Sequence, residues 1–279
     1  MASTTTDPRI VQLHQEAVDE LIDVTQTDTP LWRHWAQFPR NELNHRQRTI
    51  LALLDDLNDI PACELGLRIY NCTYAAPCRT VLCPHCRQLA QRAMATHLTG
   101  KFRSCGYEQL RFLTVLCDLS DDPIHELPAL RERLKDRLDY ALNRLPTKPR
   151  VYGAYELDVK HPDYAQSYRA REVLGALGMD FRSRKDFSYL LHLHAVVDLN
   201  GGDDEQLKRS LKASFPGPYR VRCTRLWSHR TVAENLTTLG HYMTKTRLQH
   251  SDNLYGSSAS GKARYMDFYP YPVVRQVTH

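Results

Sequence analysis

Two histidines, two positions apart, are the residues best placed to do chemistry. His192 and His194 lie within the apolar run from Leu190 to Leu199. Alternate residues of a β-strand share one face, so both imidazoles would point the same way while apolar side chains fill the other face. Neutral imidazole is a common ligand of divalent metals. The pair is a candidate metal site; the alternative is two hydrogen-bonded core or surface histidines.

A carboxylate upstream could complete this site. The segment 151–159 reads as a strand, and the same alternation gives one face to Tyr152, Ala154, Glu156 and Asp158. A glutamate in the middle of a strand is unusual unless its face is wet or binds something. Glu156 is therefore our candidate third ligand, with an exposed strand carboxylate as the alternative.

The cysteines predict a second metal site. Five of the eight fall within residues 63–86, in a chain without a recognisable secretory signal, so we expect reduced thiols. Cys83-Pro-His-Cys86 is typical of a zinc knuckle, because thiolates at this spacing reach one tetrahedral ion. The sequence does not determine which two residues complete the zinc site. Cys72 and Cys78 are nearest, Cys63 is a substitute, and His85 and His97 are weaker candidates.

The elements that must hold these residues follow from periodicity. Strands are expected at 111–117, 151–159, 190–198 and 219–227. Helices are expected at 8–24, 43–57, 87–103, 123–145, 204–215 and 231–243, and the capping residues Asp122, Asp203 and Thr231 predict the starts of the last three. From residue 111 the order is strand, helix, strand, strand, helix, strand, helix, which predicts an α+β fold of the split β-α-β type with an antiparallel sheet. Its second and third strands would be neighbours, which brings Glu156 to the histidines.

The chain is expected to divide into four parts. These are an N-terminal helical region at 1–60, a zinc-binding module with its helix at 61–104, a core at 105–250 and a C-terminal tail at 251–279. We expect a cytoplasmic protein without membrane contact, because the N-terminus is polar and no apolar run reaches membrane-spanning length.

The charge permits a polyanionic partner. The formal net charge is +5 and the sequence pI is about 8.7, which allows nucleic-acid binding without requiring it. Basic and apolar residues alternate in the segment 219–227. We therefore expect Arg220, Arg222 and Arg225 to contact DNA from one strand.

Taken in order, the motifs resemble those of the HUH endonucleases. The matching residues are the segment 112–116 before a long helix, mid-strand Glu156, His192-Leu-His194, and Tyr242 three residues before Lys245. The cysteine cluster resembles the zinc knuckle that precedes these motifs in rolling-circle replication initiators and related transposases. The resemblance covers roughly residues 63–248.

The resemblance implies site-specific nicking of single-stranded or hairpin origin DNA. Tyr242 would be the nucleophile, Lys245 would lie near the scissile phosphate, and His192, His194 and Glu156 would hold Mg²⁺ or Mn²⁺. A host helicase and polymerase would be further partners. A phenol, with a pKa of about 10, needs a cation or a base to act at neutral pH. The product would be a 5′-phosphotyrosine that a later 3′-hydroxyl can resolve.

The sequence differs from the motifs of this family at two positions, and three alternative functions are also possible. Thr238 stands where some initiators carry a glutamate used in termination, and Thr246 stands where others have a second tyrosine, so a one-tyrosine enzyme is expected. The alternative functions are a transposase or relaxase with the same chemistry, a nicking-inactive zinc-containing DNA-binding protein, and a zinc hydrolase, which would need further metal ligands.

Overall fold

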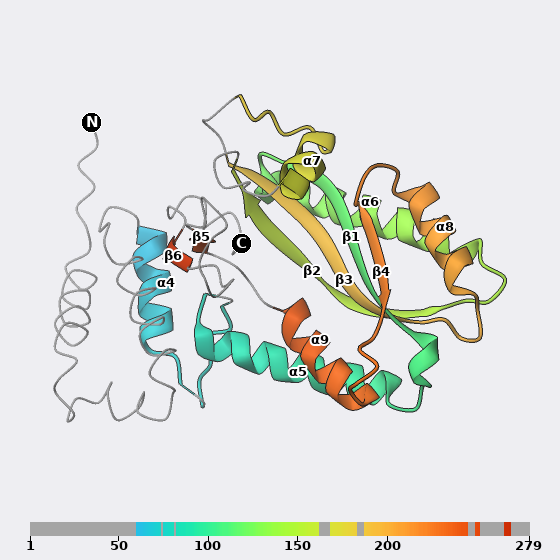
Figure 1. Ribbon diagram of the computed structural model, residues 1–279. Coiled ribbons are helices and arrows are strands. Elements are labelled where there is room, and N and C mark those ends of the chain that lie inside the picture. The colour runs from blue at the N-terminus through green and yellow to red at the C-terminus, as the bar shows by residue number, and fades with distance from the viewer. Residues whose placement is uncertain are drawn as a thin grey trace, which may run out of the picture. The chain divides into compact units, whose positions relative to one another are not determined.

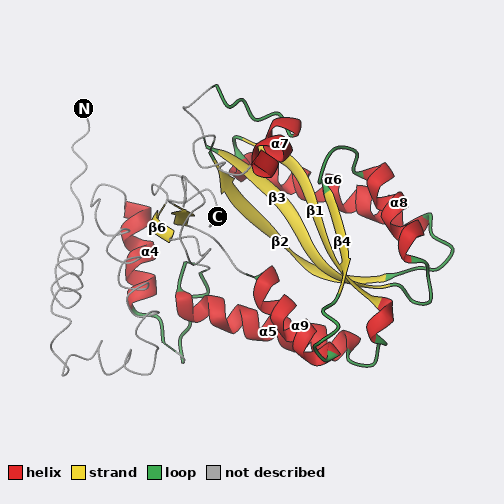
Figure 2. Cartoon of the chain, in the orientation of Figure 1, coloured by secondary structure: helices red, strands yellow, loops and turns green. Residues whose placement is uncertain are grey.

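The computed structural model describes residues 60–73, 75–80, 82–161, 168–182, 187–244, 249–251 and 265–268. Within them the chain has the α+β class expected, with a four-stranded antiparallel sheet and helices on both of its faces (Figures 1 and 2). The elements are α4 (Ile60–Tyr70), α5 (Pro84–Phe102), η1 (Tyr107–Gln109), β1 (Leu110–Ser120), α6 (Pro123–Asn143), β2 (Arg150–Lys160), α7 (Tyr168–Ala176), β3 (Ser188–Asp198), α8 (Asp204–Ser214), β4 (Val221–Arg225), α9 (Val232–Met243), β5 (Gln249–Ser251) and β6 (Tyr265–Phe268).

The sheet has the strand order β2-β3-β1-β4. Its two central strands, β1 and β3, come from different halves of the sequence, and the expected pairing of β2 with β3 is confirmed. The register sets Glu156 opposite His192 and Ala154 opposite His194. The connection from β2 to β3 contains the short helix α7, which periodicity did not predict.

The helix starts expected from capping residues are present. Asp122 accepts a hydrogen bond from His125 N at the start of α6, and Asp203 accepts bonds from two backbone N–H groups at the start of α8. Thr231 and Glu234 form a reciprocal capping box at the start of α9. Each cap satisfies backbone donors that a helix cannot pair internally, so the element boundaries follow from local chemistry.

The two faces of the sheet have different roles. One face, with Leu191, Leu193, Ala195 and Val197 of β3, packs against α6 and α8 in the main apolar core. On the other face, Val196 belongs to a cluster with α5 and α9, and Leu190 belongs to a separate cluster with α7. The even-numbered residues between those clusters include both histidines. The histidine face is thus covered by apolar packing at either end, with a polar band between.

The chain divides into two compact units, and the division falls within α5 after Leu89. The first includes α4 and the cysteine cluster; the second includes the four-stranded sheet. Some predicted features lie outside the described residues. They are the helices expected near 8–24 and 43–57, the residue Lys245 and most of the expected C-terminal tail. Among the helices that are described, none combines the length and apolar character needed to cross a bilayer.

Candidate metal centres

The polar band of the sheet brings together three residues predicted to bind one ion. His194 Nε2 lies 3.0 Å from Glu156 Oε2, and His192 Nε2 lies 3.7 Å from the same oxygen. One donor atom from each residue lies within 4.8 Å of the other two, a spacing that could hold a metal ion. Glu156 is 6%, His192 6% and His194 1% exposed. The register of β2 and β3 therefore brings the three predicted ligands together.

Burial of this carboxylate requires a compensating charge. Neither oxygen of Glu156, nor Nε2 of His192, makes a hydrogen bond within the described part of the chain. A buried ionised carboxylate is costly unless it is paired, hydrogen-bonded or bound to a cation. The donor set of two imidazoles and one carboxylate suits a divalent transition metal or, with added oxygen ligands, Mg²⁺ or Mn²⁺.

Two neighbouring residues shape the site. Thr114 Oγ1 on β1 lies 3.0 Å from His194 Nδ1. If Nε2 carries the metal, Nδ1 holds the proton and donates it to this hydroxyl, which fixes the ring orientation. Asp158 Oδ2 lies 3.5 Å from His192 Nε2 and 2.9 Å from Lys160 Nζ.

Asp158 remains ionised beside the site. Burial would raise its pKa, but the Lys160 ammonium and His192 outweigh that effect and hold the pKa of Asp158 well below its usual range. Sequence reasoning did not assign a role to Asp158 or Thr114. The strand alternation that selected Glu156 also places Asp158 on this face, whereas Thr114 could be found only from the pairing of β1 with β3.

Tyr242 lies beside the histidines. Its ring is 5.0 Å from that of His194, centroid to centroid, and meets it edge-on at 72°. It also meets Phe112 of β1 at 5.7 Å. The side chain is 40% exposed, so one part of the ring packs on the site while the rest is open to solvent. The structure thus brings Tyr242 together with the predicted metal ligands.

The position of Tyr242 depends on how α9 is anchored. Asn235 is fully buried, and its side chain bonds the backbone of Trp227, Arg230 and Thr231, which fixes the loop before the helix. Near the other end, a Cβ at Gly240 would lie 2.6 Å from the backbone of Ala95 in α5. A glycine is therefore required where the two helices cross. This close approach explains a residue of low helix propensity in α9.

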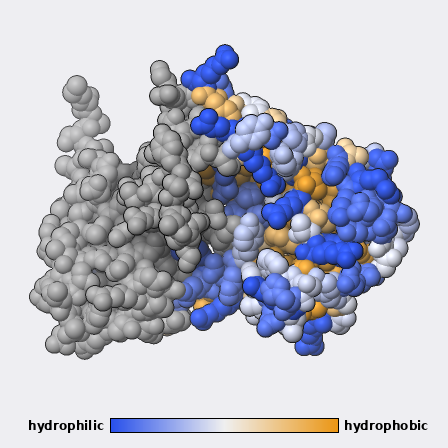
Figure 3. Space-filling view, viewed as in Figure 1, coloured by the Kyte–Doolittle hydropathy of each residue, from blue (hydrophilic) through white to orange (hydrophobic). Residues whose placement is uncertain are grey.

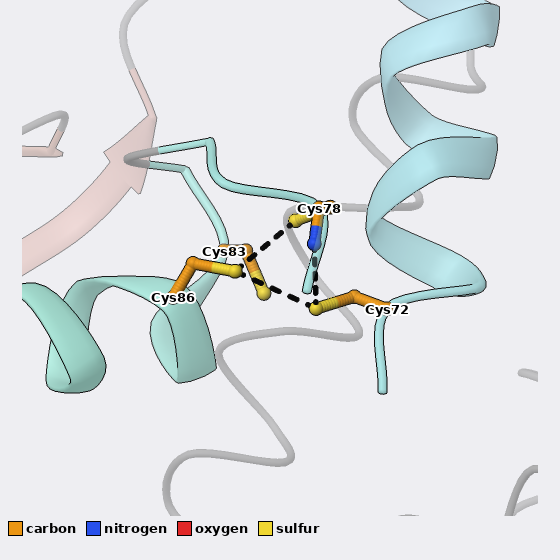
Figure 4. A group of neighbouring side chains, drawn as sticks. All are labelled: Cys72, Cys78, Cys83 and Cys86. Carbon is orange, nitrogen blue, oxygen red and sulfur yellow. Dashed lines mark hydrogen bonds between the residues drawn. The ribbon is translucent and has the colours of Figure 1, made fainter. Parts of the chain in front are cut away.

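The second candidate centre is a group of four thiols. Cys72, Cys78, Cys83 and Cys86 converge between the end of α4 and the start of α5 (Figure 4). Cys86 Sγ is 3.6 Å from Cys72 Sγ and 3.5 Å from Cys78 Sγ. Disulfide sulfurs are about 2.05 Å apart, whereas thiolates around tetrahedral zinc, with bonds of about 2.3 Å, are separated by about 3.8 Å. The spacing fits a shared ion.

Backbone donors support the same conclusion. Cys78 N donates to Cys72 Sγ at 3.3 Å, and Arg79 N donates to Cys86 Sγ at 3.2 Å. Such outer bonds orient metal ligands. Burial raises the pKa of Cys72 to about 11, and contact with Cys83 raises the pKa of Cys78 far above its usual value. Four adjacent thiols cannot all ionise without a cation, which a bound metal would provide.

The three arginines predicted to contact DNA do not share one face of the sheet. Arg222 of β4 is exposed and, by its pairing with Thr114, lies on the histidine face. Arg225 pairs with Arg111, lies on the opposite face, and approaches Glu108 at 3.6 Å. Arg220 forms an ion pair with Asp118 at 2.8 Å. Cys63 lies in α4, but its side chain, like the whole of Lys245, is outside the described part.

Comparison with known proteins identifies no relative, since no protein-family model, curated protein or solved structure matches the chain.

Proposed function

We propose that this protein is a metal-dependent tyrosine nuclease of the HUH type that nicks single-stranded DNA and can rejoin it. The observation that carries the proposal is the convergence of His192, His194 and Glu156 on one buried point of the sheet with Tyr242 against His194. Two imidazoles and a carboxylate also occur in zinc hydrolases. A partly exposed tyrosine packed against a ligand ring favours attack by the protein itself.

Each residue has a role in this chemistry. The Tyr242 phenol oxygen attacks phosphorus in line, a 5′-phosphotyrosyl bond forms, and the O3′–P bond breaks to leave a 3′-hydroxyl. The two histidines and Glu156 would hold Mg²⁺ or Mn²⁺, which supplies positive charge at the phosphate. Thr114 keeps His194 in the ligating tautomer. Reversal of the attack by a 3′-hydroxyl rejoins DNA without ATP, because the phosphotyrosyl bond keeps the bond energy.

We further propose that the four-cysteine group holds structural Zn²⁺ and that the protein initiates rolling-circle replication at a hairpin origin, working with a host helicase and polymerase in the cytoplasm. Support for zinc comes from the thiol spacing and the N–H donors around it. A role for Lys245 near the scissile phosphate and for Arg222 in binding the strand belongs to the same proposal. Arg222 is the exposed cation on the histidine face of β4.

The test is covalent trapping of DNA. A labelled single-stranded hairpin library is incubated with Mn²⁺ and either the wild type, Tyr242→Phe or Tyr140→Phe, and label on the protein is measured after denaturing electrophoresis. Tyr140 is an exposed tyrosine of α6, 59% exposed, and serves as the matched control. We expect adducts with the wild type and Tyr140→Phe, and none with Tyr242→Phe. An adduct retained by Tyr242→Phe, or hairpin binding without any adduct, would contradict the proposal.

A further inference from the structure

A groove runs along α5 and α9, the helices that cover one end of the histidine face. Its volume is about 600 Å³, and its lining includes two arginines, a histidine, three threonines and small residues: Arg92, Ala95, Thr96, Thr99, Gly100, Arg103, Thr237 and His241. The α5 residues fall three or four positions apart, so they form one stripe of that helix. Arg92 and Arg103, which directly follows α5, stand at the two ends of this stripe.

The arginines of the groove are not neutralised. Both are exposed, and neither makes an ion pair with any residue that the structure describes. The sequence has no aspartate or glutamate from Pro84 to Tyr107. Two arginines of the sheet are paired instead, since Arg111 contacts Asp204 and Arg150 contacts Asp198. The groove therefore carries two uncompensated positive charges, on a molecule whose described surface is mostly hydrophilic in the view of Figure 3.

The lining suits a phosphodiester backbone. Arginine and threonine are typical donors to phosphate oxygens, and such contacts hold a DNA strand without reading its sequence. Arg92 and Arg103 are eleven residues apart, about 16 Å along the helix axis, which spans several successive phosphates of a strand. A protein partner would be expected to bury apolar anchors, whereas this groove offers charge and hydroxyls.

We infer that the α5–α9 groove binds the backbone of the single-stranded DNA next to the nick site. The inference rests on the proposed function. His241 lines the groove and immediately precedes Tyr242, and Gln91 of α5 donates to the His241 carbonyl at 3.4 Å. A strand held in the groove would therefore pass the last turn of α9, where the tyrosine lies. None of the arginines predicted to contact DNA, Arg220, Arg222 and Arg225, lines this groove.

The experiment measures DNA binding as a function of salt. A fluorescent single-stranded DNA of mixed sequence is titrated, without added Mg²⁺ or Mn²⁺, into the wild type and the double variant Arg92→Gln/Arg103→Gln. The matched control is Arg133→Gln/Arg209→Gln, which removes equal charge from exposed positions of α6 and α8. Thermal unfolding of each variant verifies its fold. We expect the groove variant to bind roughly tenfold more weakly and its log–log salt slope to fall by about 1.4, with no slope change in the control.

Equal slopes for the two double variants would overturn the inference, since binding would then depend on net charge alone. The adduct assay with Mn²⁺ is run on the same proteins to separate this result from the proposed function. Weaker binding by the groove variant, together with no adduct in the wild type, would support the groove as a DNA-binding site and contradict the proposed nuclease activity. Adducts in the wild type, together with unchanged binding by the groove variant, would support the nuclease activity and contradict the groove as a DNA-binding site.

Discussion

At the scale of single residues, the buried carboxylate of Glu156 determines what the site can be. It is almost inaccessible to water, and its oxygens make no hydrogen bond within the described residues. The nearest groups that can offset its charge are His192 and His194, and neutral histidines would leave the charge uncompensated. A divalent cation would offset this charge, with Glu156, His192 and His194 as the residues that would hold it.

Thr114→Val tests the outer partner of His194. Valine keeps the branched shape of threonine but removes the hydroxyl 3.0 Å from His194 Nδ1. Loss of such a partner typically lowers metal affinity about 10- to 100-fold, and we expect that loss for Mn²⁺ measured by titration calorimetry. Thr224→Val is the control, because Thr224 pairs with Phe112 on the same face. Equal Mn²⁺ affinities for the two variants would show that Thr114 does not orient a ligand.

At the scale of elements, the crossing of α5 and α9 positions the tyrosine. Gly240→Ala would place a methyl group 2.6 Å from the Ala95 backbone, so α9 must move away from α5. Overpacking of this kind costs about 1–3 kcal/mol, more than the gain of up to about 1 kcal/mol in helix propensity. We expect a lower thermal midpoint and fewer DNA adducts.

The control for this prediction is a second glycine of the same helix pair. A Cβ at Gly100 meets nothing within 4 Å. Gly100→Ala should therefore stabilise the protein by about 0.5–1 kcal/mol. A Gly240→Ala protein as stable as Gly100→Ala would show that the helices do not need this close approach.

Helix α8 is tied to the sheet by a buried cation. Arg111 is 3% exposed, and its Nε lies 3.0 Å from Asp204 Oδ1. Burial would raise the pKa of Asp204, but hydrogen bonds from Arg111 and Lys208 outweigh it and lower the pKa. A depressed carboxyl pKa adds stability above the unfolded-state value of about 4, and that stability is lost as the pH falls through the folded pKa.

Asp204→Asn should cost about 2 kcal/mol at neutral pH, because it leaves Arg111 buried without its partner. The variant should also lose less stability than the wild type on acidification below about pH 4. Urea unfolding at several pH values measures both. Glu205→Gln, at a neighbouring carboxylate that is 66% exposed, should change stability by no more than about 0.5 kcal/mol. Parallel acid profiles for the wild type and Asp204→Asn would refute this account.

At the scale of the whole molecule, the two compact units depend on different interactions. Among the residues that the structure describes, the unit with α4 buries few apolar side chains besides its cysteines, whereas the sheet unit has an extensive core. Removal of metal by a strong chelator should therefore release one ion and make four more thiols reactive, while the main unfolding transition of the sheet remains. Ellman titration and calorimetry check this. Cys105→Ser should behave as the wild type, and Cys78→Ser should not retain the ion.

The sequence predicted what local rules determine. Strand alternation with antiparallel pairing placed Glu156 beside His192, and capping chemistry located the start of α9 at Thr231. Features that depend on packing between distant elements were not predictable. Gly240 has no local reason to be glycine, because only its contact with Ala95 of α5 requires one. The placement of Arg222 and Arg225 on opposite faces, by contrast, follows from strand alternation, since they are three positions apart.

The most direct test of the central claim is Mn²⁺ binding followed by electron paramagnetic resonance. The wild type should bind one Mn²⁺ with magnetic coupling to histidine nitrogen, and His192→Ala/His194→Ala should lose both the ion and the coupling. His125→Ala/His229→Ala, at exposed positions, should keep them. Mn²⁺ binding without nitrogen coupling, or binding unchanged by loss of both strand histidines, would contradict a metal centre at this site.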